Sequence, residues 1–123
     1  MTVSKNKVYI AGPMRGYPQF NFPAFQAATD YFRELGWEVC NPAEKDDKTY
    51  GKEMATTNLS GSIEEAEKEF GFSLREALGY DLNWICKNAT HIYMLSGWEK
   101  SRGAMAEHAT AVALDIKVMY EQN

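Results

Sequence analysis

Four short runs of β-favouring residues alternate with helical patterns, and this alternation constrains the fold of the chain more than any other feature. The runs are Lys7 to Ala11, Trp37 to Cys40, Thr90 to Leu95 and Ile116 to Tyr120. Strands that alternate with helices predict a parallel sheet covered by helices on both faces. A chain of 123 residues has room for one hydrophobic core. We therefore predict a single three-layer α/β domain over residues 1–123, with about four to five strands.

The helices are predicted from apolar residues that recur at three- and four-residue steps. The first follows Asn21 as its N-cap, ends at Gly36 and turns these residues inward: Phe25, Ala28, Phe32 and Leu35. A second, about Ser73 to Lys87, turns another set inward: Leu74, Ala77, Leu78, Leu82 and Ile85. A third runs from Ala104 to about Leu114. These three helices are expected to cover the sheet.

The region from Ala43 to Gly61 is polar and has no apolar period. We interpret it as a mobile surface insertion. The residues Ser62-Ile63-Glu64-Glu65 form a capping box that predicts a charged helix to about Phe70.

Charge and cysteine content exclude several classes of function. The net charge is −4 and the basic residues are scattered, so no nucleic-acid polymer is expected as a partner. Cys40 and Cys86 lack metal-ligand spacing, and we expect reduced thiols and no metal. No window approaches the length of a membrane span, and no signal peptide precedes the first strand. The expected location is the cytoplasm.

Ligands of parallel α/β sheets bind beyond the carboxyl ends of the strands. Two loops are expected to meet there: Gly12-Pro13-Met14-Arg15-Gly16 after the first strand, and the loop that ends in Ser101-Arg102-Gly103 after the third. The first loop matches no phosphate-binding fingerprint and is equally typical of a strand-to-helix turn. Ser101 is either a helix N-cap or part of an anion site, and the same geometry serves both roles.

Glu107 is the only acidic residue of the last helix before Asp115. At helical spacing it shares a face with Ala104, Ala111 and Leu114, which predicts a carboxylate that faces protein or a pocket. The alternative is a glutamate on the outer face, the commonest location of this residue type. Burial would raise the pKa of Glu107, whereas the positive helix end would lower it and favour an ionised nucleophile.

Three segments in this order resemble the nucleoside 2-deoxyribosyltransferase superfamily. They are Val8-Tyr9-Ile10-Ala11-Gly12-Pro13-Met14-Arg15-Gly16, Asp81-Leu82-Asn83-Trp84-Ile85 and Ser101-Arg102-Gly103-Ala104-Met105-Ala106-Glu107. Within the superfamily, the sequence is similar to small uncharacterised members common in bacteriophage genomes and to 2′-deoxynucleoside 5′-monophosphate N-glycosidases. The resemblance implies a flavodoxin-like or Rossmann-like fold and activity without a metal or organic cofactor.

The resemblance also implies roles for individual residues. Glu107 would attack the anomeric carbon of deoxyribose, Asp81 would contact the sugar or protonate the departing base, and Tyr9 would orient the nucleophile. The residues implied to bind substrate are Gly12, Met14, Arg15, Gly16, Ser101 and Gly103. Ser101 stands where transferases of free nucleosides carry Asp, and a serine accepts a phosphate that an aspartate would repel. Asp81 alone is also compatible with an exposed helix position.

Three features depart from the superfamily pattern, namely the insertion, Trp98 and Arg102, so the resemblance does not imply which base is recognised. Trp98 either stacks on a base or packs beside the strand. We expect an N-glycosidase that releases free base and 2-deoxyribose 5-phosphate from a nucleotide. The alternatives are a transferase that exchanges bases and a non-catalytic nucleotide-binding module. Relatives are commonly homo-oligomers, so at least a homodimer is expected.

Overall fold

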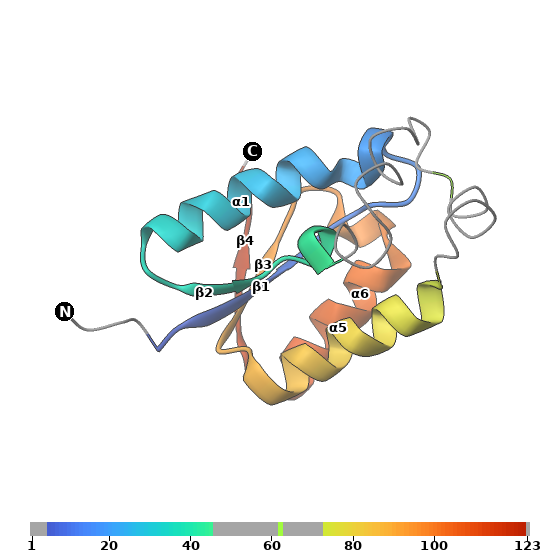
Figure 1. Ribbon diagram of the computed structural model, residues 1–123. Helices are drawn as coiled ribbons and strands as arrows, with labels where there is room; N and C mark the ends of the chain where they lie inside the picture. The colour runs from blue at the N-terminus through green and yellow to red at the C-terminus, as the bar shows by residue number, and fades with distance from the viewer. Residues whose placement is uncertain (1–4, 46–61, 63–72, 123) are drawn as a thin grey trace.

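The computed structural model describes residues 5–45, 62 and 73–122. Its strands are β1 (Lys7–Ala11), β2 (Glu38–Cys40), β3 (His91–Met94) and β4 (Lys117–Tyr120). Its principal helices are α1 (Phe22–Glu34), α5 (Leu74–Asn88) and α6 (Arg102–Ala113), and two 3₁₀ turns, η1 (Pro18–Asn21) and η2 (Trp98–Lys100), precede α1 and α6 (Figure 1). The predicted alternation of strands and helices is confirmed in these residues.

The four strands form one sheet in the order β2-β1-β3-β4, and every pairing is parallel. β1 is central, and Tyr9 lies opposite Cys40 on one side and Ile92 on the other. The chain leaves β1 for β2 and later returns to the other side of β1 as β3. The switch of direction therefore falls at β1 and β3, where ligands of such sheets bind.

Alternate side chains of β1 enter two different cores, because successive strand residues point to opposite faces of a sheet. Val8 and Ile10 pack with Phe25 and Phe32 of α1. Tyr9 and Ala11 pack in a second cluster with residues of α5 and α6. Figure 1 shows α1 on one side of the sheet and α5 with α6 on the other. The protein thus has the predicted three-layer α/β architecture, of the flavodoxin-like and Rossmann-like type.

The start of α1 differs from the prediction in its cap. Asn21 is the N-cap residue, but it has a left-handed backbone with φ of 62°, and its side chain makes no cap hydrogen bond. Its amide nitrogen instead donates to the Pro13 carbonyl at 3.0 Å. Asn21 therefore ties the loop after β1 to α1.

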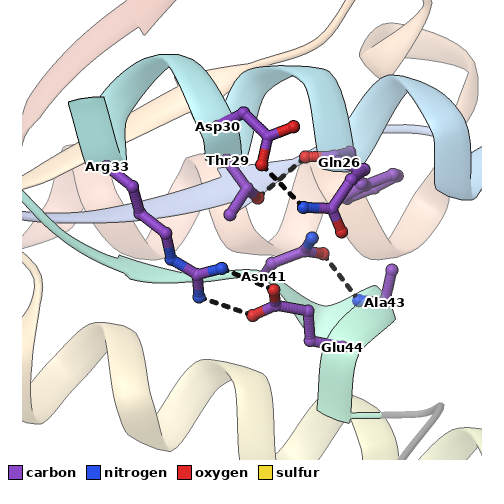
Figure 2. A network of polar contacts seen from close by, with 8 residues as sticks. Gln26, Thr29, Asp30, Arg33, Asn41, Ala43 and Glu44 are labelled. Carbon is purple, nitrogen blue, oxygen red and sulfur yellow. Dashed lines mark hydrogen bonds and ion pairs between the residues drawn. The ribbon is translucent and has the colours of Figure 1, made fainter.

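The predicted insertion is wrong over its first residues, because residues 42–45 are helical. Asn41 caps it, accepting from the Ala43 amide through Oδ1 at 2.8 Å. Arg33 of α1 holds Glu44 through two hydrogen bonds of 2.6 Å (Figure 2). Four helical residues are too few to show an apolar period in the sequence. The remainder of the predicted insertion and nearly all of the predicted helix from Ser62 to Phe70 lie outside the described residues.

Three leucines predicted to face inward are exposed, namely Leu35, Leu74 and Leu114. Leu35 and Leu114 are C-cap residues, where the chain is already leaving the helix, and Leu74 is the first residue of α5. Helical spacing predicts a buried face only while the helix lies against the sheet. At these three helix ends the sheet no longer covers the side chains.

None of the helices in the described ranges has the length and apolar character needed to span a bilayer.

Candidate active site

Glu107 and Tyr9 meet beneath the centre of the sheet. The Tyr9 hydroxyl donates a hydrogen bond of 2.7 Å to Glu107 Oε2. Tyr9 is completely buried, and Glu107 is only 6% exposed. α6 places Glu107 on the same buried face as Ala104 and Ala111, whose small side chains let the helix approach the sheet closely. The prediction that Glu107 faces protein is therefore confirmed, and the exposed alternative is wrong.

Asp81 faces the same region from α5. It is 8% exposed and lies on the buried face of the helix between Ala77 and Ile85. α5 and α6 pack against one another, so the two carboxyl groups come from neighbouring helices. Among the described residues, Asp81 Oδ1 has no hydrogen-bond partner. The alternative of an exposed Asp81 is therefore wrong.

Burial governs the acidity of both carboxyl groups. It raises the pKa of Glu107 to about 8, with a further rise from the charge of Asp81 and an opposing effect of the Tyr9 hydrogen bond. It raises the pKa of Asp81 to about 6, although the charge of Lys45 and the Tyr9 hydroxyl lower it. Between these values the pair carries one proton, which resides on Glu107. The Tyr9 pKa is raised well above its usual value by burial and by both acids.

The positive end of α6, which was predicted to lower the pKa of Glu107, does not decide whether this carboxyl group is charged. α6 begins at Arg102, two residues before its predicted start, and Glu107 is its sixth residue. The field of a helix terminus falls off within the first turn, whereas the cost of burial acts at full strength on Glu107. Of the two opposing effects predicted for the pKa of Glu107, burial therefore outweighs the helix end and favours the protonated form in the free protein.

The loops after β1 and β3 meet at the carboxyl edge of the sheet, as predicted. Gly12 lies so close to Leu95 that a Cβ atom on Gly12 would stand 2.7 Å from the Leu95 Cβ. A Cβ on Gly97 would stand 2.9 Å from the Tyr17 hydroxyl. Glycine at these two positions allows the loops to touch. Gly12 thus has a packing role, beside its implied role in substrate binding.

The structure spreads the other predicted binding residues over this edge. Ser101 caps α6, accepting from the Ala104 amide at 3.2 Å, so its N-cap role is confirmed. Met14 packs against the α1-side core. Arg15 and Gly16 are exposed, and Gly16 has a positive φ of 84°. A Cβ on Gly103 would meet no described atom within 4 Å. Their contact with a substrate remains a prediction.

Two residues at this site had been assigned no role, Cys40 and Trp84. Both pack against the core cluster that contains Tyr9, and the Trp84 and Tyr9 rings lie 6.3 Å apart. Burial, together with Asp81 and Glu107, raises the pKa of Cys40 to about 12, so this thiol stays protonated. Both residues line a cavity of about 330 Å³ between β2, residues 44–45 and α5. The sequence contained a signal that Trp84 belongs to this site, because it lies three residues after Asp81.

Trp98 packs against the protein. Its ring stacks on His108 at 4.3 Å, and His108 Nε2 lies 2.9 Å from the Tyr120 hydroxyl. Trp98 also contacts the core cluster beneath α6. Of the two interpretations of this residue, the structure favours packing.

No group of three or more His, Cys, Asp or Glu side chains in the described parts of the chain is arranged to hold a metal ion. A family model described as "Domain of unknown function (DUF4406)" matches residues 6–120. No curated protein and no solved structure matches the chain.

Proposed function

The chain belongs to the DUF4406 family, a domain of unknown function, and for this member we propose an N-glycosidase that acts on 2′-deoxynucleoside 5′-monophosphates. The products are the free base and 2-deoxyribose 5-phosphate. One observation carries the proposal: two carboxyl groups, Glu107 and Asp81, are buried together, and the Tyr9 hydroxyl holds one of them at 2.7 Å. Such a pair, kept from water at high cost, is typical of acid–base and nucleophilic chemistry on a glycosidic bond.

In the proposed first step, the Glu107 oxygen that does not accept from Tyr9 attacks the anomeric carbon. The bond from that carbon to the base nitrogen breaks, and its electron pair leaves with the base. Asp81 donates the proton that the departing base requires. The carboxylate stabilises the oxocarbenium-like transition state and then forms a covalent glycosyl-enzyme. In the second step, water attacks the anomeric carbon, Asp81 accepts a proton from it, and Glu107 is released.

The single proton of the carboxyl pair is sufficient for this chemistry. In the free site it rests on Glu107, since the pKa of Glu107 is about 8 and that of Asp81 about 6. The proposed reaction needs the other arrangement, with Glu107 ionised and Asp81 protonated. A gap of about two units costs roughly 3 kcal/mol for this transfer, which is small against a typical enzymatic rate enhancement. The proton therefore moves within the pair before attack.

The phosphate is assigned to the start of α6. The Ser101 hydroxyl accepts from the Ala104 amide and keeps its own proton for a phosphate oxygen. The first amides of a helix also favour an anion. Arg15 is exposed in the loop after β1 and would add a charge-assisted contact. The resemblance supports this assignment, because the monophosphate hydrolases carry serine at this position.

Incubation with each 2′-deoxynucleoside 5′-monophosphate, followed by chromatography of free base, tests the proposal. The wild-type protein should release base from at least one of them, and Glu107→Gln, which keeps the size of the side chain, should not. Ser101→Asp should favour the free nucleoside over the nucleotide. Absence of base release from every substrate, or full activity of Glu107→Gln, contradicts the proposal.

The same assay separates the alternatives. A base-exchanging transferase would form a new nucleotide or nucleoside when a second base is supplied. A binding module would raise its melting temperature with nucleotide and release no base. A module of that kind has no need of a buried carboxyl pair, and for this reason we favour the enzyme.

We also propose that the protein self-associates in the cytoplasm. Large apolar side chains are exposed on and beside α6, namely Met105, Val112, Leu114 and Tyr120. An apolar face of this kind favours contact with a second copy. Sedimentation at micromolar concentration should give at least a dimer, and a monomer would contradict this expectation.

A further inference from the structure

The turn of helix at residues 42–45 is fixed to both neighbouring layers. Arg33 of α1 binds Glu44 through both of its terminal nitrogens, and Asn41, itself 3% exposed, caps the turn (Figure 2). On the other side, Lys45 Nζ lies 4.6 Å from the centre of the Tyr80 ring of α5. A cation over an aromatic face is attracted to it. Lys45 is thereby directed toward α5, over the half-exposed ring of Tyr80.

Lys45 places a positive charge on the side of the site from which it acts on Asp81. Tyr80 immediately precedes Asp81 in α5. Lys45 and Tyr80 line the same cavity as Cys40 and Trp84, the two residues that pack against the Tyr9 cluster. The charge of Lys45 acts on both Asp81 and Cys40, lowering the pKa of each. Lys45 thus shares a cavity with Cys40 and Trp84, and its charge acts from there on Asp81.

Four groups with a charge or a titratable proton act on or lie beside Asp81. They are Tyr9 from β1, Cys40 from β2, Lys45 from the turn at residues 42–45, and Glu107 from α6. Lys45 is the cation of this set; Tyr9 and Cys40 are neutral and Glu107 carries the proton. Asp81 Oδ1 has no hydrogen-bond partner among the described residues, and within this set of groups Lys45 supplies the positive charge that favours the ionised form of Asp81.

We propose that Lys45 is a positioning residue that keeps the negative charge of the pair on Asp81 and the proton on Glu107 until a substrate enters. The nucleophile is then protected by its proton in the free protein. This consequence for catalysis rests on the proposed function, whereas the placement of the proton does not. Removing the charge of Lys45 should make the proton affinity of Asp81 more similar to that of Glu107.

The test is a pH titration of the Asp81 side-chain carboxyl by carbon NMR, with Asp81→Asn to assign its signal. In Lys45→Met the pKa of Asp81 should rise by roughly one unit, the lower end of the effect of a close opposite charge. Lys45→Arg should restore the wild-type value. Lys87→Met is the matched control, because it removes the same charge from an exposed position on α5 and should leave Asp81 unchanged.

An unchanged Asp81 titration in Lys45→Met overturns the proposal, and so does an equal shift in Lys87→Met. The titration needs no substrate and therefore reads the role of Lys45 even if no nucleotide is cleaved. Failure of the proposed function would appear separately, as absence of base release by the wild-type protein. Where activity is present, the acidic limb of the pH profile should move upward in Lys45→Met and return in Lys45→Arg.

Discussion

At the scale of the residue, Tyr9, Asp81 and Glu107 are unusual because they are ionisable side chains that are buried together. Each is almost completely enclosed, and burial disfavours the charged form of an acid. Burial therefore sets the acidity of Asp81 and Glu107 at values close to neutrality. A general acid works best when its pKa is near the working pH. Under the proposed function, the pair could therefore exchange a proton with a substrate near neutral pH.

The pH dependence of kcat/KM should be bell-shaped, with limbs near pH 6 and pH 8. Below about 6 both acids are protonated, and no carboxylate is present to attack. Above about 8 both are ionised, and no proton is available for the base. Initial rates of base release from pH 5 to 9 provide the measurement. A rate that only rises through pH 8 would mean that Asp81 accepts a hydrogen bond from the sugar instead of donating a proton.

Tyr9→Phe should move the basic limb of this profile to higher pH. The hydroxyl donates to Glu107 and lowers its pKa, so its loss makes the proton of Glu107 harder to remove. Tyr31→Phe is a control that removes a hydroxyl from an exposed residue of α1 and should leave the limb in place. If both variants keep the wild-type limb, the Tyr9 hydroxyl does not act on Glu107 in solution.

At the scale of the element, the site depends on how closely strands and helices approach. The loop after β1 touches the residue that follows β3 at Gly12, and a side chain on Gly12 would collide with Leu95. α6 comes near the sheet because Ala104 and Ala111 flank Glu107 on its buried face. Small residues at these contacts are therefore what bring the loops and carboxyl groups together.

Gly12→Ala should destabilise the protein by about 1 to 3 kcal/mol. The added methyl group would stand 2.7 Å from Leu95 Cβ, and a packed core accommodates such an atom only by shifting its neighbours. Gly79→Ala is the matched control, since a Cβ there meets no described atom within 4 Å. In the middle of α5 that change should stabilise by roughly 0.5 to 1 kcal/mol. Urea denaturation measures both, and equal effects of the two variants would refute the packing role of Gly12.

The sequence predicted the sheet well because its signals are local. Each strand is a short β-favouring run, and the positions of β1 and β4 agree with prediction to within a residue. The buried position of Asp81 was left open although Ala77 and Ile85, four residues to either side of it, were predicted to face inward, because an acidic residue is most often exposed. Its burial depends on the packing of α5 against α6, a long-range contact that spacing within one helix does not encode.

The residues that surround Asp81 and Glu107 were even harder to predict from the sequence. Cys40 comes beside Tyr9 only through the register of β1 with β2, and Lys45 reaches α5 only because Arg33 anchors Glu44. Both depend on residues far apart in the chain. The Tyr9–Glu107 contact spans 98 positions and was expected solely from the family resemblance.

At the scale of the whole molecule, the carboxyl pair should make stability depend on pH in an unusual direction. Asp and Glu have pKa values of about 4 in an unfolded chain, and both are raised in the folded protein. From pH 4 to 8 the folded state therefore binds more protons than the unfolded state. The contribution of the two acids to the free energy of unfolding is fully present below their pKa values in the unfolded chain. It is lost as the pH rises through about 6 and about 8.

Glu107→Gln should consequently raise the melting temperature at pH 8.5 while abolishing activity. The amide keeps the shape of the acid and carries no charge to bury, which relieves roughly 2 to 5 kcal/mol at this pH. The difference between variant and wild type should vanish near pH 4. Scanning calorimetry at the two pH values gives the comparison, and a variant less stable than wild type at pH 8.5 would argue against a buried acid of raised pKa.

The central claim is that Glu107 becomes bonded to the sugar. Rapid acid quench during turnover of a cleaved 2′-deoxynucleotide, followed by mass spectrometry of the peptides, tests it directly. The account predicts a 2-deoxyribose 5-phosphate adduct on the peptide that contains Glu107, and none in Glu107→Gln. An adduct on Asp81, or release of base with no adduct under conditions in which water attack is slowed, would contradict it.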